Sequence, residues 1–224
     1  MERIVCDSND LPARAAARIA LELTKAIGAR GKASLALAGG TTPKATYEAL
    51  AGLPLEWSVI DIFFGDERCV PADHSDSNYR MAKAALFDRI AVPSERVHRL
   101  QGELADRDAA ARAYEAELPD RLDVVVLGIG EDAHTASLFP GSPALLEEQR
   151  LVLPVIGPKP PPERLSLTPP ALRNARLCLV LGSGAGKAEP VRRALKDPID
   201  ISSTPIQLAR EGVWFLDQAA AASL

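Results

Sequence analysis

The chain has 224 residues, 47% of them hydrophobic, which is enough for one large α/β domain with a sizeable core. Its formal net charge of −4 argues against general binding to nucleic acid or to an anionic membrane surface. The three cysteines fit no metal-ligand pattern, which favours reduced thiols and a cytoplasmic protein. No secretory leader opens the chain and no apolar run reaches the ~20 residues that span a bilayer, so we expect no membrane partner.

The first half of the chain alternates between strands and helices, each recognised by its hydrophobic period. The strand after the first helix runs into a glycine turn, Gly39 to Pro43, and the next strand runs into a long polar loop, which invites a functional explanation. In chain order we predict a strand over 4–6, a helix over 10–27, a strand over 34–38, a helix over 44–51, a strand over 57–64, a helix over 79–86, a short strand over 97–100 and a helix over 104–118.

The second half is organised around the apolar run 124–127, which lacks alternation, as a strand buried on both faces of a parallel sheet should. Alternating strands and helices imply an α/β fold with a three-layer, doubly wound, mainly parallel sheet, which we assign to a single domain over residues 1–224. After the central strand we predict a short helix from Asp132 to Pro140, a strand over 151–156, a stiff loop at the prolines 160–162, patterned structure over 164–167, a strand over 177–181, a helix through 194–195, a short helix from 204 and a strand over 213–216.

Two glycine-rich turns at predicted strand ends are suited to hold a phosphate. The amides of Gly39 to Pro43 lie at the positive end of a helix, and the threonine hydroxyls there add donors. Ordinary turn chemistry, with Thr42 as a helix cap, explains the same pattern. The turn Gly184 to Lys187 ends in a lysine that could close on a phosphate, although a solvated lysine is the simpler interpretation. Arg68 and Arg164 could each supply a fork for phosphate or carboxylate.

His134 stands out among the three histidines because it follows the buried central strand and a glycine turn. Asp132, two residues earlier, could orient its ring. Imidazoles titrate near ~6.5 and are suited to take a proton from water at neutral pH. A histidine that caps the predicted helix is the alternative. Ser137 could face His134 on that helix, but no nucleophile-elbow motif surrounds it.

Six segments, in order along nearly the whole chain, resemble the 6-phosphogluconolactonase family. They are LAGGTTP at 37–43, FFGDERCVP at 63–71, SDSNYRMAK at 75–83, GIGEDAHTASLFPG at 128–141, PPERLSLT at 161–168 and SGAGKA at 183–188. The resemblance implies a hydrolase without cofactor or metal that converts 6-phospho-glucono-1,5-lactone to 6-phosphogluconate in the pentose phosphate pathway. It also implies the sugar-phosphate isomerase-like variant of the doubly wound sheet. We expect the sugar phosphate lactone as partner and a monomer, with a dimer left open.

Carried over position by position, the resemblance implies that His134 is the general base and Asp132 its neighbour in the motif. One position departs from the family, which usually has glycine where Ala133 stands. If that position requires a positive φ, alanine costs ~1 kcal/mol and could tilt His134. The implied substrate and phosphate contacts are Gly39, Gly40, Thr41, Thr42, Asp66, Arg68, Arg164 and Lys187.

Two other functions compete with lactone hydrolysis. The related glucosamine-6-phosphate deaminases share the glycine turn and the aspartate-x-histidine element, but here Phe139 stands where their acid-base glutamate would fall. A non-catalytic sugar-phosphate sensor would keep the phosphate turn and the basic residues without needing His134. No helix-turn-helix extension or basic tail supports a DNA-bound regulator.

Overall fold

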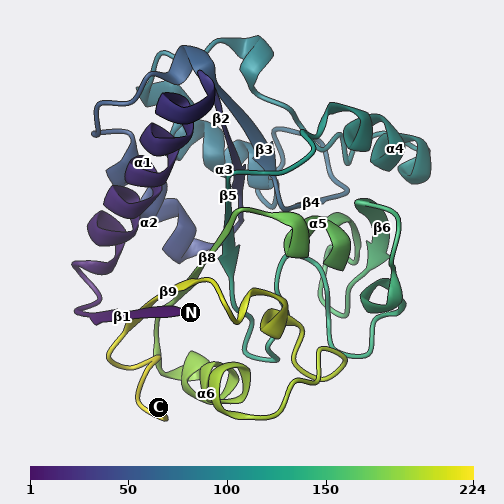
Figure 1. Ribbon diagram of the computed structural model, residues 1–224. Coiled ribbons are helices and arrows are strands. Elements are labelled where there is room, and N and C mark those ends of the chain that lie inside the picture. The colour runs from purple at the N-terminus through teal and green to yellow at the C-terminus, as the bar shows by residue number, and fades with distance from the viewer.

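The computed structural model describes all 224 residues, and its centre is a sheet of six parallel strands (Figure 1). The strands lie in the order β1-β9-β8-β5-β2-β3. The predicted α/β class and the mainly parallel sheet are confirmed. The bounds are β1 Glu2–Cys6, β2 Ala33–Leu37, β3 Ile60–Phe64, β5 Val124–Gly128, β8 Leu177–Gly182 and β9 Val213–Asp217.

Helices lie on both sides of the main sheet. The helices α1 and α2 pack against each other, α1 also contacting β2 and β9, and α2 contacting β5 and β8. On the other side, α5 packs on a 3₁₀ turn, Pro205–Ala209, which contacts β8. The predicted three-layer arrangement is therefore confirmed. The helices are α1 Leu11–Arg30, α2 Thr41–Leu50, α3 Asn78–Ala85, α4 Arg107–Glu117, α5 Pro169–Asn174 and α6 Ala188–Lys196.

The sequence order of the strands reverses between β2 and β5. The chain passes from β2 outward to β3 on one side, and from β5 outward through β8 and β9 on the other. In open α/β sheets, the crevice at the carboxyl ends of the strands at such a switch point is where ligands bind. Here the two strands end at Leu37 and Gly128, directly before the glycine turns.

A smaller antiparallel sheet, in the order β4-β7-β6, lies beside the main sheet (Figure 1). Its strands are β4 Asp66–Arg68, β6 Val152–Ile156 and β7 Glu163–Leu167. Gly65 joins the two sheets, because its N–H donates to Leu37 of β2 at 2.8 Å and its carbonyl accepts from Leu167 of β7 at 2.8 Å. The side chains of β4 and β7 are thereby placed next to the carboxyl end of β2.

In the first half of the chain, three predictions differ from the structure. Residues 57–59 form a 3₁₀ turn, and β3 begins only at Ile60. The predicted strand over 97–100 is reduced to one bridge between Val97 and Ile62. Asp66–Arg68, which we predict as the end of the strand over 57–64, is a separate strand because β7 offers it hydrogen-bonding partners.

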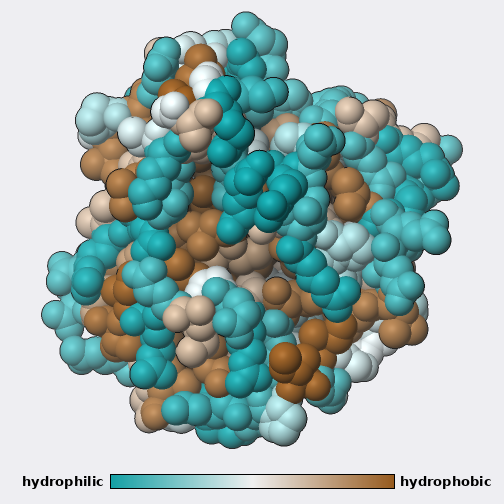
Figure 2. All heavy atoms as spheres, viewed as in Figure 1, coloured by the Kyte–Doolittle hydropathy of each residue, from teal (hydrophilic) through white to brown (hydrophobic).

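The surface of the face drawn in Figure 1 is mostly hydrophilic, with hydrophobic residues visible mainly toward its centre and lower edge (Figure 2). No helix of the structure is both long and apolar enough to cross a membrane.

Candidate active site

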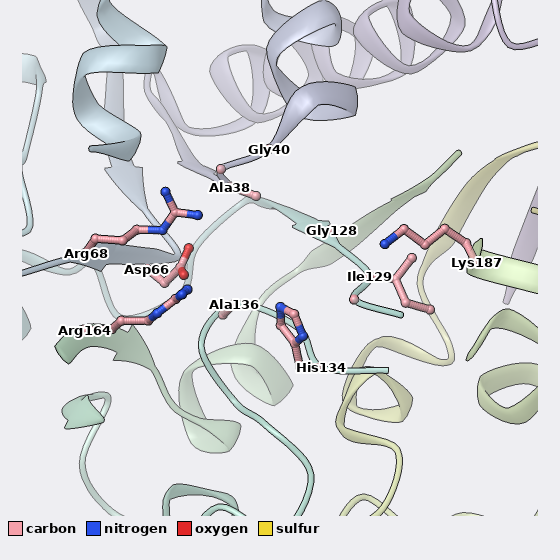
Figure 3. Close-up of a pocket in the computed structure, with 12 residues that line it drawn as sticks. Ala38, Gly40, Asp66, Arg68, Gly128, Ile129, His134, Ala136, Arg164 and Lys187 are labelled. Atoms are coloured by element: carbon pink, nitrogen blue, oxygen red, sulfur yellow. The ribbon is translucent and has the colours of Figure 1, made fainter. Parts of the chain in front are cut away.

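A cavity of about 210 Å³ opens at the switch point between β2 and β5 (Figure 3). The turns that follow β2 and β5 border the cavity through their glycines. His134 points into it, between Arg164 on one side and Lys187 on the other. The topology thus brings together side chains that are far apart in the sequence. The lining residues are Ala38, Gly39, Gly40, Asp66, Arg68, Gly128, Ile129, Gly130, His134, Ala136, Arg164 and Lys187.

The turn after β2 faces the cavity with its backbone, whereas its threonine side chains face a different hollow. Gly39 and Gly40 line the cavity, whereas Thr41 and Thr42 line a separate hollow of about 220 Å³ that Ser183 also borders. Gly39 has no room for a side chain, since a Cβ there would lie 2.0 Å from the Oδ1 atom of Asn78. The geometry leaves amides, rather than threonine hydroxyls, as the groups with which this turn faces the cavity.

His134 is paired with Asp132, at the predicted spacing but not on the predicted helix. The Nδ1 atom of His134 lies 2.5 Å from Oδ1 of Asp132, which also accepts the backbone N–H of His134 at 3.2 Å. Partial burial raises the pKa of Asp132, but the hydrogen bond to His134 and its charge outweigh burial and leave that pKa below its ordinary value. An ionised Asp132 holds a proton on Nδ1 and leaves Nε2 free to accept one.

The helix predicted from Asp132 to Pro140 is wrong, because the segment is irregular. Ala133 and Ala136 have positive φ values of 70° and 48°, which no α-helix contains. Hydrogen bonds to other elements replace the helical ladder: Thr135 Oγ1 donates to the Gly128 carbonyl, and the N–H of Ser137 donates to Ser166 Oγ in β7. Tertiary contacts override the helix propensity of the alanines.

Ser137 does not face His134 but binds Asp66. Its Oγ donates to the Asp66 carboxylate at 2.7 Å, and Asn78 Nδ2 donates to the same carboxylate at 3.1 Å. Asp66 is only 5% exposed and lies between Arg68 and Arg164 (Figure 3). The sequence pattern carries no signal for these contacts of Ser137 and Asn78, since three separate segments meet here.

Arg68 and Arg164 approach the cavity from the small sheet. Arg68 donates to the carbonyl of Asp76, while its buried Nε has no protein partner. Arg164 is only 7% exposed, and this burial lowers its pKa. The negative charge of Asp66 raises the pKa of Arg164, whereas the positive charge of Arg68 lowers it further. An arginine stays charged at neutral pH despite such shifts, so two guanidinium groups flank one carboxylate.

Lys187 enters the cavity from the opposite side, at the end of the loop after β8 (Figure 3). Asp217, at the end of β9, accepts hydrogen bonds from Ser183 Oγ at 2.6 Å and from the N–H of Gly184 at 2.8 Å. These bonds fix the loop that carries Lys187. No group of three or more His, Cys, Asp or Glu side chains is arranged to hold a metal ion.

Comparisons with known proteins agree with the resemblance in the sequence motifs. A family model described as glucosamine-6-phosphate isomerases/6-phosphogluconolactonase matches residues 6–215. Among curated relatives, the 6-phosphogluconolactonase of Synechocystis sp. is 39% identical over 94% of this chain and 92% of its own, and that of Mycobacterium tuberculosis is 39% identical over 97% and 96%.

Solved structures give the same result. The crystal structure of 6-phosphogluconolactonase from Thermotoga maritima superposes with a TM-score of 0.86 at 30% identity, covering 97% of this chain and 99% of that one. A monomeric glucosamine-6-phosphate deaminase superposes with a TM-score of 0.86 over both whole chains, but at 24% identity, so it shows a common fold alone.

Proposed function

Because the chain belongs to the glucosamine-6-phosphate isomerase/6-phosphogluconolactonase family, we propose that it hydrolyses 6-phospho-glucono-1,5-lactone to 6-phosphogluconate, with His134 as the general base. The enzyme class is that of the lactone hydrolases that it resembles over nearly its whole length. The observation that carries the proposed mechanism is the Asp132–His134 pair, whose imidazole lines a cavity bordered by three cationic side chains.

The charges around the cavity suit a phosphorylated substrate. Arg68, Arg164 and Lys187 oppose one lining carboxylate, Asp66, which leaves an excess of two positive charges. A phosphate monoester carries about −1.5 to −2 at neutral pH. Arg164, Lys187 and the amides of the turn after β2 bind this phosphate and so hold the lactone carbonyl over the imidazole.

In the proposed reaction, neutral His134 takes a proton at Nε2 from a water molecule as the water oxygen bonds to C1 of the lactone. The carbonyl π electrons move to the carbonyl oxygen, and the resulting oxyanion needs a nearby positive group or N–H donor. Arg68 supplies this positive group, which is supported by its place among the residues that line the cavity. When the bond from C1 to the ring oxygen breaks, the imidazolium returns its proton to that oxygen, and the product is a carboxylic acid that ionises.

The assay for this proposal follows acid release from freshly prepared phosphogluconolactone, in excess of the spontaneous rate. His134→Ala should lose about 10²–10⁴-fold in kcat, as expected for loss of a general base, while still binding 6-phosphogluconate. Wild-type protein that bound the sugar phosphate without accelerating hydrolysis would be a sensor instead. Release of ammonia from glucosamine-6-phosphate would identify a deaminase.

A further inference from the structure

We infer that Phe139 is a positioning residue, whose ring sets the imidazole of His134 and the guanidinium of Arg164 relative to each other, and that Gly157 leaves the space that this requires. The inference rests on the proposed function, in which one of these groups activates water and the other binds phosphate. A residue without polar side-chain atoms thereby sets the relative positions of two polar groups in the site.

The ring of Phe139 contacts both groups. Its centroid lies 4.6 Å from that of the His134 ring at an interplanar angle of 38°, and 5.5 Å from the Cζ atom of Arg164. Phe139 is only 5% exposed, so its ring is fixed by packing. An arginine within ~6 Å of an aromatic centroid is attracted to the face of the ring, and the attraction is stronger when both groups are desolvated.

Few other contacts orient Arg164. Its Nε donates to the carbonyl of Pro161 at 3.2 Å and its Nη2 to that of Lys159 at 3.4 Å, while Ser137 Oγ lies at the limit of hydrogen bonding, 3.5 Å away. No carboxylate lies within ion-pair distance of Arg164. The face of Phe139, together with the longer-range attraction of Asp66, therefore determines where this cation sits.

Gly157, at the start of the loop between β6 and β7, adjoins the edge of the same ring. A Cβ there would lie 2.8 Å from Cε2 and 3.0 Å from Cζ of Phe139, and 3.3 Å from Nε of Arg164. Its φ is not positive, so an alanine is compatible with the backbone and its effect would be steric. Gly157→Ala therefore displaces the ring and the guanidinium without replacing any residue that lines the cavity.

The kinetic test compares the lactone with and without its phosphate. Phe139→Leu, which removes the aromatic face, should raise KM for the phosphorylated lactone about tenfold and lower kcat several-fold. For unphosphorylated glucono-1,5-lactone, kcat should fall without the rise in KM. Gly157→Ala should change the same constants in the same direction. Phe87→Leu removes a ring that packs on Phe64 and Tyr79, and should leave both constants unchanged.

A double-mutant cycle with Arg164→Met separates positioning from general loss of packing. If Phe139 acts on KM through Arg164, Phe139→Leu should raise KM no further in the Arg164→Met background, to within about twofold. Additive effects in the cycle, or an equal rise in KM for both lactones, would overturn the inference.

A measurement that needs no turnover uses the imidazole NMR signals. The chain has three histidines, and in Phe139→Leu the signals of His134 should shift while those of His74 and His98 stay in place. Unchanged His134 signals together with unchanged KM would overturn the positioning role. If the wild type failed to hydrolyse the lactone, the proposed function would fail, but these signals and the calorimetric affinity for 6-phosphogluconate would still test the inference.

Discussion

Ala133 is held at φ 70°, a left-handed conformation in which a β-carbon is strained. Its N–H donates to the Gly130 carbonyl at 3.0 Å and its own carbonyl accepts from Ile206 at 3.1 Å, so hydrogen bonds at both ends hold it there. The family usually has glycine at this position, which led us to consider a positive φ there, and Ala133 has one. The alanine carries the strain next to His134 without moving the histidine away from Asp132.

We predict that Ala133→Gly changes the free energy of unfolding by less than about 0.5 kcal/mol. Glycine relieves roughly 1–2 kcal/mol of backbone strain, but it costs roughly 0.5–1 kcal/mol in chain entropy and about 0.8 kcal/mol for the buried methyl group that is lost. Urea denaturation measures the change. Ala110→Gly, at a buried position of the regular helix α4, is the matched control and should lower the free energy of unfolding by about 2 kcal/mol, because no strain is relieved there. A loss of stability of the same size at both positions would show that Ala133 is not strained.

Asp132 is predicted to act through the orientation of His134. Asp132→Asn should lower kcat by at least about 10²-fold, as when the orienting aspartate of a catalytic histidine is neutralised, and should leave KM nearly unchanged. Steady-state kinetics measure kcat and KM separately. A rise in KM with an unchanged kcat would contradict this role of Asp132.

The lowered pKa of Asp132 also sets the sign of a pH effect. Its stabilising contribution is complete above the unfolded value of about 3.9 and is lost as the pH falls through the lower folded pKa. Denaturation midpoints measured between neutral pH and pH 3 should therefore fall less steeply for Asp132→Asn than for the wild type.

Two helices are tied to strand ends by tyrosine hydroxyls. Tyr47 of α2 accepts the N–H of Ala38 at 2.7 Å and donates to its carbonyl at 3.0 Å, and Tyr114 of α4 makes the same pair of bonds with Phe64 at 2.6 and 3.1 Å. Both tyrosines are buried, which raises their pKa values. Each bonded residue directly precedes a turn that leads to the cavity.

We predict that Tyr47→Phe and Tyr114→Phe each lower the free energy of unfolding by about 1–3 kcal/mol, because each leaves a buried N–H and carbonyl without partners. The third tyrosine, Tyr79, is only partly buried and makes stacking contacts through its ring. Tyr79→Phe keeps the ring and should change stability by less than about 0.5 kcal/mol. Urea denaturation of the three variants tests the contrast, and equal effects at all three positions would contradict it.

At the scale of the whole molecule, one hydrophobic cluster of 56 buried residues runs through both sheets. It includes Leu35 and Val125 of the main sheet together with Val152, Leu165 and Leu167 of the small sheet. The small sheet could not keep these side chains buried alone, because three short strands do not enclose a core of their own. We propose that the chain is a single cooperative domain.

This proposal predicts a single two-state unfolding transition. Trp57 and Trp214 report on the main sheet by fluorescence, whereas far-UV circular dichroism reports on all helices and strands. The two probes should give coincident urea transitions. A dichroism change that began at lower urea than the fluorescence change would indicate that the small sheet unfolds separately.

The sequence by itself determined the parallel sheet, the glycine turns at its strand ends and the pairing of Asp132 with His134. These features depend on local patterns: an apolar run such as 124–127 is typical of a strand buried on both faces, and a turn after it leaves the sheet at its carboxyl edge. The family motifs added the activity, because their residues recur in order along the chain.

Only the tertiary structure decided which surfaces of these turns face the cavity and which contacts hold His134 and Arg164. Asp66–Arg68 becomes a strand by pairing with a segment far along the chain, and residues 132–139 remain irregular because Ser137 and Thr135 bond to other elements. The ring of Phe139 meets His134 and Arg164 only where the two sheets join. Hydrophobic period and turn composition are local quantities, whereas these contacts arise between distant segments, whose hydrogen bonds and packing outweigh local propensity.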